Sequence, residues 1–160
     1  MSKKNIITGV SGLLIGVVLT MVVMFLSAPS MMLKEDVSKY DFERTAMELR
    51  KAIDDHGWKL PTVHDLKETM ENFGKTGIKN AKVFEICHPD HAYKILSRDD
   101  ERIVSSLMPC RISIYEKSDG KVYVSRMNTS LMGSMMKGVV PEVMKDASAE
   151  SEAIINSIIR

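Results

Sequence analysis

The chain has 160 residues, with 22 Lys and Arg against 21 Asp and Glu, so its formal net charge is +1. This length indicates one domain with a short additional segment. The balanced charge excludes the basic surface typical of nucleic-acid-binding domains, so we expect no nucleic-acid partner.

The N-terminal segment is apolar enough to cross a membrane. Ile6–Leu26 contains no charged residue, and a helix rising about 1.5 Å per residue spans a bilayer core of ~30 Å over this length. Lys3 and Lys4 precede the run, so the positive-inside rule places the N-terminus in the cytoplasm. The predicted organisation is a cytoplasmic N-terminus (1–4), a transmembrane anchor (5–27), a linker (28–30) and a domain (31–160). We therefore expect a single-pass protein of the cytoplasmic membrane, with its domain periplasmic or extracellular.

A cleaved signal peptide is the alternative to an anchor. The best small-residue cleavage site, Ala28, is followed by Pro29, and Leu26 stands where a small residue would be needed. These residues favour an uncleaved anchor. Within it, Gly12 and Gly16 form a Gly-x-x-x-Gly pair that could seat a helix dimer, although glycine is common in membrane helices generally.

The domain mixes strands and helices. Asp41 and Asp65 are predicted helix N-caps, and Pro61 places its strand at a sheet edge. Alternation and helical periodicity predict strands over 31–38, 58–64, 83–87, 111–117 and 121–127, and helices over 42–56, 66–73, 99–107 and from Pro89 and Pro141 onward.

Both cysteines lie at strand ends in the central part of the domain. Cys87 ends an alternating strand, and Pro89 fits the first turn of the helix that follows. Cys87 is therefore expected near a helix N-terminus, where backbone dipoles favour a thiolate. Cys110 stands beside Arg111, whose guanidinium could also lower the thiol pKa.

The turn between the last two strands can be argued from the hydrophobic pattern. A two-residue Asp119-Gly120 turn would pair Ile114 with Ser125, whereas a three-residue loop from Ser118 pairs Ile114 with Val124. Only the second places both apolar residues on one buried face, with Gly120 left-handed.

This register predicts two faces of the sheet. The core face carries Phe84, Ile86, Ile112, Ile114, Val122 and Val124. The opposite face carries Glu85, Cys87, Arg111, Ser113, Tyr115, Tyr123, Ser125 and Met127, and would be solvated, a dimer surface or a ligand platform. By the same alternation, the Cys110 side chain is expected on the core face and the Cys87 side chain on the opposite face. This argues weakly against a disulfide between them.

From about Met31 to the C-terminus, the chain resembles the DUF302 family of bacterial and archaeal proteins. The resemblance rests on Ile86-Cys87-His88-Pro89 with Ala92, Met108-Pro109-Cys110-Arg111-Ile112, Tyr115-Glu116, Asp65-Leu66-Lys67-Glu68-Thr69, Asp119-Gly120-Lys121-Val122, Met132-Gly133 and Val143-Met144. It implies a compact α/β domain with an antiparallel sheet, often dimeric, and no agreed reaction. The predicted fold is thus α/β (α+β), a two-layer antiparallel sheet with helices on one face, preceded by one transmembrane helix.

Several kinds of chemistry could use the residues near Cys87. The two cysteines could be reactive thiols, a disulfide, or small buried residues. Cys87, His88 and His91 could ligate zinc or copper, or could simply be capping and solvated side chains. Methionines 132, 135 and 136 could bind Cu(I), but packing is favoured. We predict no cofactor; a metal or a haem is the alternative, although no Cys-x-x-Cys-His occurs.

The favoured function is non-enzymatic. We expect a homodimeric module that binds a small ligand or a protein partner near Cys87, His88, Arg111, Tyr115 and Tyr123, and no catalytic residue is assigned. One alternative is a thiol redox or sulfur-transfer protein that uses Cys87 or Cys110. Another is a structural accessory subunit of a membrane-protein complex.

Overall fold

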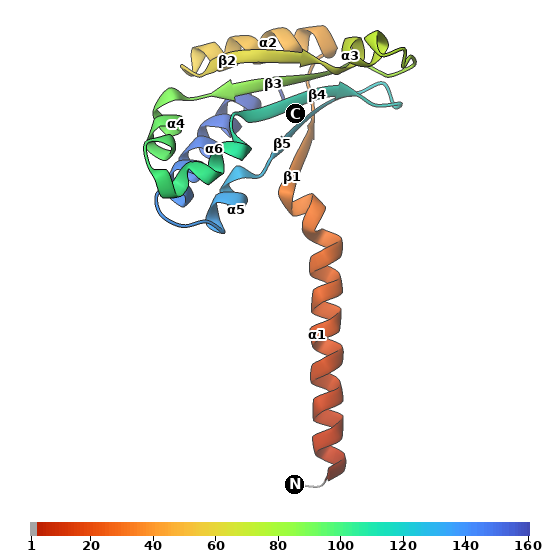
Figure 1. Ribbon diagram of the computed structural model, residues 1–160. Coiled ribbons are helices and arrows are strands. Elements are labelled where there is room, and N and C mark those ends of the chain that lie inside the picture. Colours follow the sequence, from red (N-terminus) through yellow and green to blue (C-terminus); the bar gives the residue numbers. More distant parts are fainter. Residues whose placement is uncertain (1–2) are drawn as a thin grey trace. The chain divides into compact units, whose positions relative to one another are not determined.

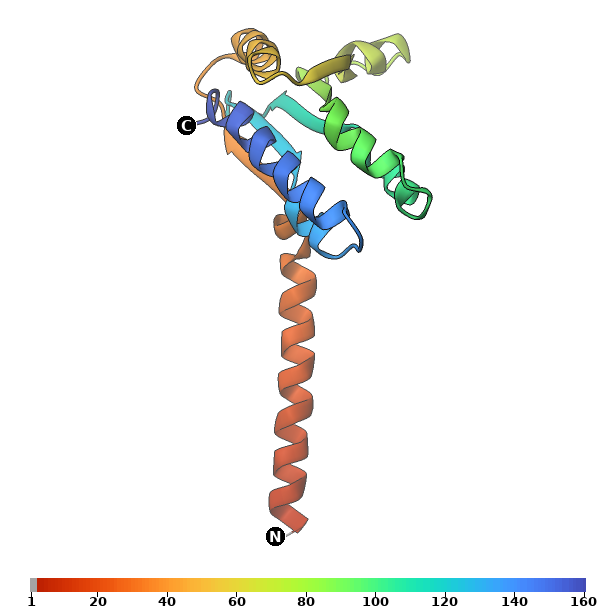
Figure 2. The same ribbon diagram turned by 90° about the vertical axis from the view of Figure 1, so that its left-hand side faces the viewer.

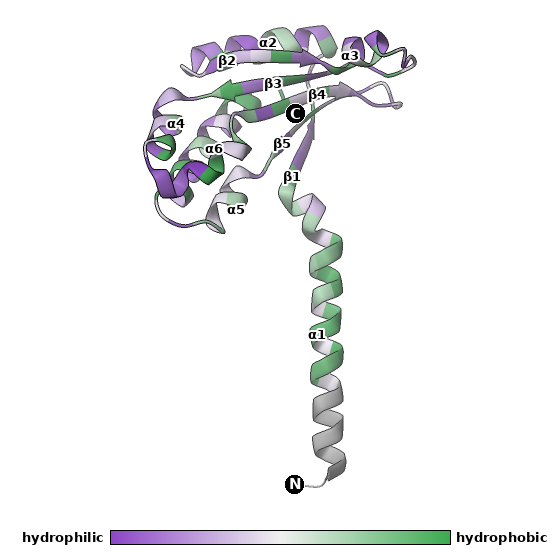
Figure 3. Cartoon of the chain, in the orientation of Figure 1, coloured by the Kyte–Doolittle hydropathy of each residue, from purple (hydrophilic) through white to green (hydrophobic). Residues whose placement is uncertain are grey.

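The computed structural model describes residues 3–160, with side chains from Gly12 onward. It divides into two compact units, residues 1–31 and 32–160. Helix α1 (Lys3–Met32) is hydrophobic along its described side chains (Figures 1 and 3). Its part Gly12–Met32 is long and apolar enough to cross a membrane, a criterion that an N-terminal signal sequence also meets.

The predicted linker is helical. Residues 28–30 belong to α1, which continues through Pro29 because the fixed φ of proline is compatible with a helix even though its N–H is missing. The first strand consequently begins at Leu33 instead of Met31. Of the predicted cytoplasmic segment 1–4, residues 1–2 and all four side chains lie outside the described part of the chain.

The domain contains one antiparallel sheet in the order β1-β5-β4-β3-β2 (Figure 1). Its strands are β1 (Leu33–Val37), β2 (Lys59–Asp65), β3 (Ala81–Cys87), β4 (Cys110–Glu116) and β5 (Val122–Met127). The predicted edge position of the strand with Pro61 is confirmed, and the β2–β3 register shifts between Lys59 and Thr62, on either side of that proline.

The predicted hairpin register is also confirmed. Ile114 pairs with Val124 and Glu116 with Val122, and Gly120 has a φ of 77°. Ile112 therefore lies opposite Arg126, which places an arginine on the core face of β5.

Helices α2 (Phe42–Asp55) and α6 (Val140–Asn156) pack on the core face of the sheet (Figures 1 and 2). Helix α2 is capped as predicted, because the Asp41 carboxylate accepts the Arg44 N–H at 2.9 Å. The main core contains Phe42, Leu49, Ile53, Trp58, Phe84, Ile86, Ile112, Ile114, Val122, Val124, Ile154, Ile155 and Ile158. The predicted α/β fold with an antiparallel sheet is confirmed.

A second, smaller core surrounds the N-terminal half of α6. It is built with α4 (Pro89–Leu96), the 3-10 helix η1 (Asp99–Leu107) and α5 (Thr129–Ser134), and contains Ile95, Val104, Val140, Val143 and Met144. Met132 and Met136 pack against it, whereas Met135 is exposed. Helix α3 (Leu66–Asn72) follows β2 and is capped by Asp65 as predicted.

Candidate functional site

A narrow cavity of about 50 Å³ lies where the main core meets the second one. Its walls come from the ends of β3 and β4, from α4 and η1, and from α6. The lining is mostly apolar and includes Trp58, Cys87, His88, His91, Ala92, Ile95, Met108, Cys110, Met144 and Ala147. The sequence-predicted residues Cys87, His88 and His91 therefore do lie around one space.

The two cysteines line this cavity together, and both are free thiols. The prediction that strand alternation places them on opposite faces is wrong, because Cys87 is the last residue of β3, directly before the N-cap of α4, where the alternation of the strand ends. Cys110 pairs with Ile86 across the two strands, and Cys87 directly follows Ile86, so the two cysteines are neighbours at the same end of the sheet.

The predicted activation of the thiols is not present. Burial raises the pKa of Cys87, and burial together with the nearby Cys87 sulfur raises the pKa of Cys110 to about 11. Arg111 gives no compensating charge, because it pairs with Glu85 and does not line the cavity. Both sulfurs are therefore held mainly as neutral thiols, which are poor nucleophiles.

Two histidines and a tryptophan form a compact aromatic group at the cavity wall. The rings of His88 and His91 have centroids 4.6 Å apart, and the Trp58 ring meets His88 edge-on at 5.7 Å. His88 is the N-cap residue of α4, as predicted, but its side chain makes no capping hydrogen bond. The ring packs on Trp58 instead.

Glu150 on α6 joins this aromatic group to the rest of the fold. Its carboxylate accepts the Trp58 indole N–H at 3.0 Å and contacts His91 Nε2 at 3.1 Å. Burial alone would raise the pKa of Glu150, but the hydrogen bonds from His91 and Trp58 outweigh it and hold that pKa below its usual value. Neither Trp58 nor Glu150 was predicted as a site residue, although Glu150 follows Ala147 at helical spacing on the core-facing side of α6.

The predicted metal ligands do not form a binding site. Among the residues whose side chains are described, no group of three or more His, Cys, Asp or Glu could hold a metal ion. Cys87, His88 and His91 share the cavity wall without forming such a group.

Arg111 lies on the opposite face of the sheet from the cavity. Its guanidinium donates to Glu85 at 3.0 Å, and His64 Nε2 lies 3.3 Å from the same carboxylate oxygen. The prediction that Arg111 shares a site with Cys87 is therefore wrong, because neighbouring residues of a strand point to opposite faces.

Tyr115 and Tyr123 form a separate cluster on that outer face. Their rings are stacked with centroids 6.0 Å apart, and Lys117 Nζ lies 3.9 Å from the Tyr123 ring. Burial and the hydrogen bond to Glu35 raise the pKa of Tyr115 to about 12. An open groove of about 830 Å³ lies beside Tyr115, bordered by Leu66, Ile78 and Lys117. The five predicted ligand-binding residues are thus divided among three places.

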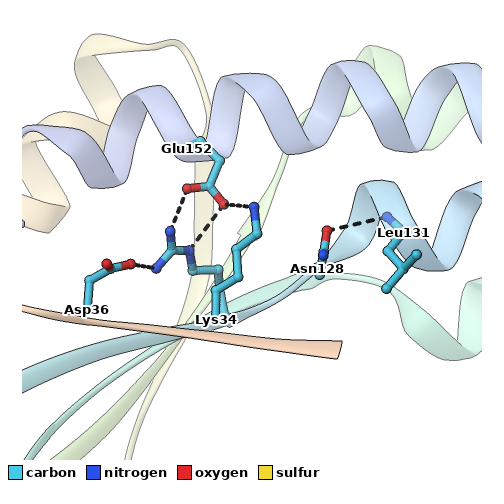
Figure 4. A network of polar contacts seen from close by, with 6 residues as sticks. Lys34, Asp36, Asn128, Leu131 and Glu152 are labelled. Carbon is cyan, nitrogen blue, oxygen red and sulfur yellow. Dashed lines mark hydrogen bonds and ion pairs between the residues drawn. The ribbon is translucent and has the colours of Figure 1, made fainter. Parts of the chain in front are cut away.

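Arg126 is the centre of a polar network that sequence reasoning missed. Figure 4 labels three other members of this network, Lys34, Asp36 and Glu152. The Arg126 guanidinium contacts Glu152 at 3.2 Å through Nε and at 2.5 Å through Nη2, and also donates to Asp36. Lys34 reaches Glu152 at 3.0 Å. Alternate residues of β5 lie on one face, so Arg126 lies on the same face as the core residues Val122 and Val124. The predicted register therefore already indicated that this arginine faces inward. The network ties β1 and β5 to α6.

The model of the family described as domain of unknown function DUF302 matches residues 34–158. An uncharacterized protein of Aquifex aeolicus (strain VF5) is 27% identical over 130 residues, covering 81% of this chain and 83% of that protein. The crystal structure of an uncharacterized conserved DUF302 protein from Bacillus stearothermophilus matches with a TM-score of 0.71 at 16% identity, over 79% of this chain and 97% of the other. At that identity the structural likeness shows the fold alone, but the family match covers most of the chain, which therefore belongs to the DUF302 family.

Proposed function

We propose that this protein is a membrane-anchored, extracytoplasmic binding module, and that its ligand site is the cavity beside His88 and His91. The observation that carries the proposal is a cavity with mostly apolar walls where the Nδ1 atoms of both histidines are buried and without a hydrogen-bond partner in the described part of the chain. Ligand sites combine an apolar lining with a few such polar groups.

The cavity size limits the ligand. A water molecule needs roughly 10–15 Å³ of cavity volume by the same measure, so about 50 Å³ accommodates a group of roughly three to four non-hydrogen atoms. Pockets for drug-sized ligands measure roughly 300–1,000 Å³, and a haem or a nucleotide would need a far larger space. The ligand we propose is a small molecule, or the small end of a larger one.

Filling the cavity tests this proposal. Ala147→Leu and Ala92→Leu each place three additional carbon atoms at the cavity wall, whereas Ala149→Leu, on the exposed side of α6, is the matched control. The ¹⁵N-labelled full-length protein in detergent is titrated with small organic probes, 2-propanol among them, and followed by amide NMR. We expect saturable shifts at cavity residues in the wild type and in Ala149→Leu, and their loss in both filled variants. Equal shifts in the filled and unfilled proteins would contradict the proposal.

The proposed location rests on the apolar helix and on the two lysines that precede it. Gly12–Met32 has a mean hydropathy of 2.3 and no buried residue, and Lys3 and Lys4 favour a cytoplasmic N-terminus. Fusing alkaline phosphatase or green fluorescent protein to the C-terminus of the chain tests the topology. Phosphatase activity without fluorescence in the membrane fraction is expected, and the reverse pattern would contradict it. Release of the domain in soluble form would instead indicate a cleaved signal sequence.

We further propose that the module is a homodimer in the membrane. A Cβ added to Gly12 or Gly16 would meet no atom of the chain within 4 Å, so a second helix can approach both glycines closely. Native mass spectrometry in mild detergent is expected to give a dimer that Gly16→Leu weakens and Ser30→Leu, at the end of α1, does not. A larger assembly with other membrane proteins would favour an accessory-subunit role.

A thiol function is the second candidate. It is favoured by one observation, that Cys87 and Cys110 line the same cavity. Their raised pKa values oppose it, and the rate at which iodoacetamide alkylates the two thiols of the folded protein decides between the two functions.

A further inference from the structure

The two cysteines stand at the two ends of one wall of the cavity. Cys87 is the last residue of β3, and Cys110 is the first residue of β4. Half of the residues that line the cavity belong to the segment between them, 88–109, which contains α4 and η1. Helix α4 buries Ile95 and η1 buries Val104, while most of their other residues are exposed or half-buried. A segment with so few buried side chains is of the kind that opens locally.

The pairing of β3 with β4 sets the spacing of the two cysteines. Cys110 pairs with Ile86, and Cys87 is the next residue of β3. Directly opposed residues have Cα atoms about 4.5–5.5 Å apart and a strand advances about 3.4 Å per residue, so the Cα atoms of Cys87 and Cys110 lie roughly 6 Å apart. Disulfides join cysteines whose Cα atoms are about 4.4–6.8 Å apart. The backbone therefore brings the two cysteines within the range of a disulfide.

The side chains of both cysteines face the same space. Each lines the cavity, and a charge on Cys87 raises the pKa of Cys110, as a neighbouring charge of the same sign does. Both residues are half-buried, and Cys110 is the more enclosed of the two. The argument from strand alternation against a disulfide therefore does not apply, and Cys87 is the thiol that a reagent from solution meets first.

We propose that Cys87 and Cys110 form a reversible disulfide, which closes the base of the segment 88–109 and so holds this wall of the cavity in place. The oxidant is an organic disulfide, such as that of an extracytoplasmic thiol oxidoreductase. The Cys87 thiolate attacks one of its sulfurs, which forms a mixed disulfide and releases a first thiol. The Cys110 thiolate then attacks the Cys87 sulfur, which forms the internal disulfide and releases a second thiol. The protons of the two cysteines end on the two released thiols, so one disulfide is reduced for each one that is formed.

This inference goes beyond the proposed binding function, because the bond changes the wall of the protein's own cavity and does not act on a substrate. The proposed extracytoplasmic location supplies the oxidising surroundings in which such bonds persist. The exchange reaction in purified protein depends on neither the ligand nor the location. Its failure is therefore distinguishable from a failure of the binding function.

Exchange with oxidised glutathione tests the inference. The full-length protein in detergent is reduced, freed of reductant and incubated with oxidised glutathione, and its remaining thiols are then blocked with N-ethylmaleimide in denaturant. Intact mass spectrometry is expected to show a monomer that has lost two hydrogen atoms and takes up no N-ethylmaleimide, and dithiothreitol should restore both thiols. Peptide mapping should join the Cys87 peptide to the Cys110 peptide. Glutathione on both cysteines, two retained thiols, or a disulfide between two chains would each overturn the inference.

A double variant, Cys110→Ser with Ser113→Cys, is the matched control. It keeps two thiols but moves one of them three residues along β4, to the position that pairs with Val83. We expect this variant to form mixed disulfides with glutathione and no internal disulfide. An internal disulfide formed as readily as in the wild type would mean that the reaction does not depend on the native spacing, and would overturn the inference.

Hydrogen exchange followed by mass spectrometry measures the effect on the cavity wall. Oxidation is expected to slow amide exchange several-fold over 88–109 and to leave α2, which is remote from both cysteines in the sequence, unchanged. Equal exchange over 88–109 in the reduced and oxidised proteins would overturn the proposed hold on the wall.

Discussion

Met144 occupies the space in which the side chain of any larger residue at position 133 would lie. A Cβ built on Gly133 would come within 2.6 Å of the Met144 Cβ, a distance shorter than any real contact of this kind. Because α5 and α6 approach so closely at this point, the second core that bounds the cavity depends on Gly133, the last residue but one of the short helix α5. This contact joins the Met132-Gly133 pair to the Val143-Met144 pair, two of the motifs on which the family resemblance was based.

Gly133→Ala is expected to destabilise the protein. Alanine in a helix interior normally stabilises relative to glycine by about 1 kcal/mol, but overpacking costs about 1–3 kcal/mol, and the contact with Met144 Cβ leaves no flexible atom to move aside. Denaturant unfolding of the full-length protein in detergent measures the change. Ser134→Ala, at the neighbouring exposed position, is the control. A Gly133→Ala protein more stable than the wild type would show that the two helices separate easily.

Arg126→Met is expected to cost about 3–5 kcal/mol of unfolding free energy, because it leaves the carboxylates of Asp36 and Glu152 without their cation. The Arg126 side chain is only 8% exposed. Lys34→Met removes the more exposed partner of Glu152 and should cost no more than about 1 kcal/mol. Chemical unfolding of both variants under the same conditions compares them. Equal losses would mean that the buried guanidinium adds nothing beyond a surface ion pair.

The same network predicts how stability depends on pH. Burial alone would raise the pKa of Glu152, but the hydrogen bonds from Arg126 and Lys34 outweigh it and hold the pKa below 4.5. A carboxyl group with a lowered folded-state pKa stabilises the fold above its unfolded pKa, and that contribution is lost as the pH falls through the folded value. The unfolding free energy should therefore fall in acid below the unfolded pKa of 4.5. Arg126→Met should show a shallower fall, and an unchanged acid slope in this variant would count against the assignment.

The two thiols should react slowly with alkylating reagents in the folded protein. A thiol pKa of about 11 in place of 9.0 for Cys110 leaves roughly 100-fold less thiolate at a mildly alkaline pH, and the thiolate is the reactive form. Intact mass spectrometry after iodoacetamide treatment, with and without denaturant, gives both rates. We expect Cys110 to be slower than Cys87, and both to become fast on unfolding. Rapid modification of either cysteine in the native protein would favour the thiol function over the binding module.

The elements that could be predicted are those whose signals are local. The caps at Asp41 and Asp65, the edge strand with Pro61 and the hairpin register around Gly120 each depend on residues within one or two turns of chain. The helical conformation of residues 28–30 was not predicted, because proline within a helix has the same sequence signal as proline after one.

The sequence by itself determined the core face of the central strands, because the side-chain period of a strand is two residues and one face must be apolar. The antiparallel sheet as a whole was implied by the resemblance to the DUF302 family. Only the tertiary structure decided the candidate site. The end of β3 turns Cys87 toward Cys110, and α6 brings Glu150 to His91 and Trp58 from a distant part of the chain. Such contacts depend on where helices and strand ends pack, which no local pattern of residues records.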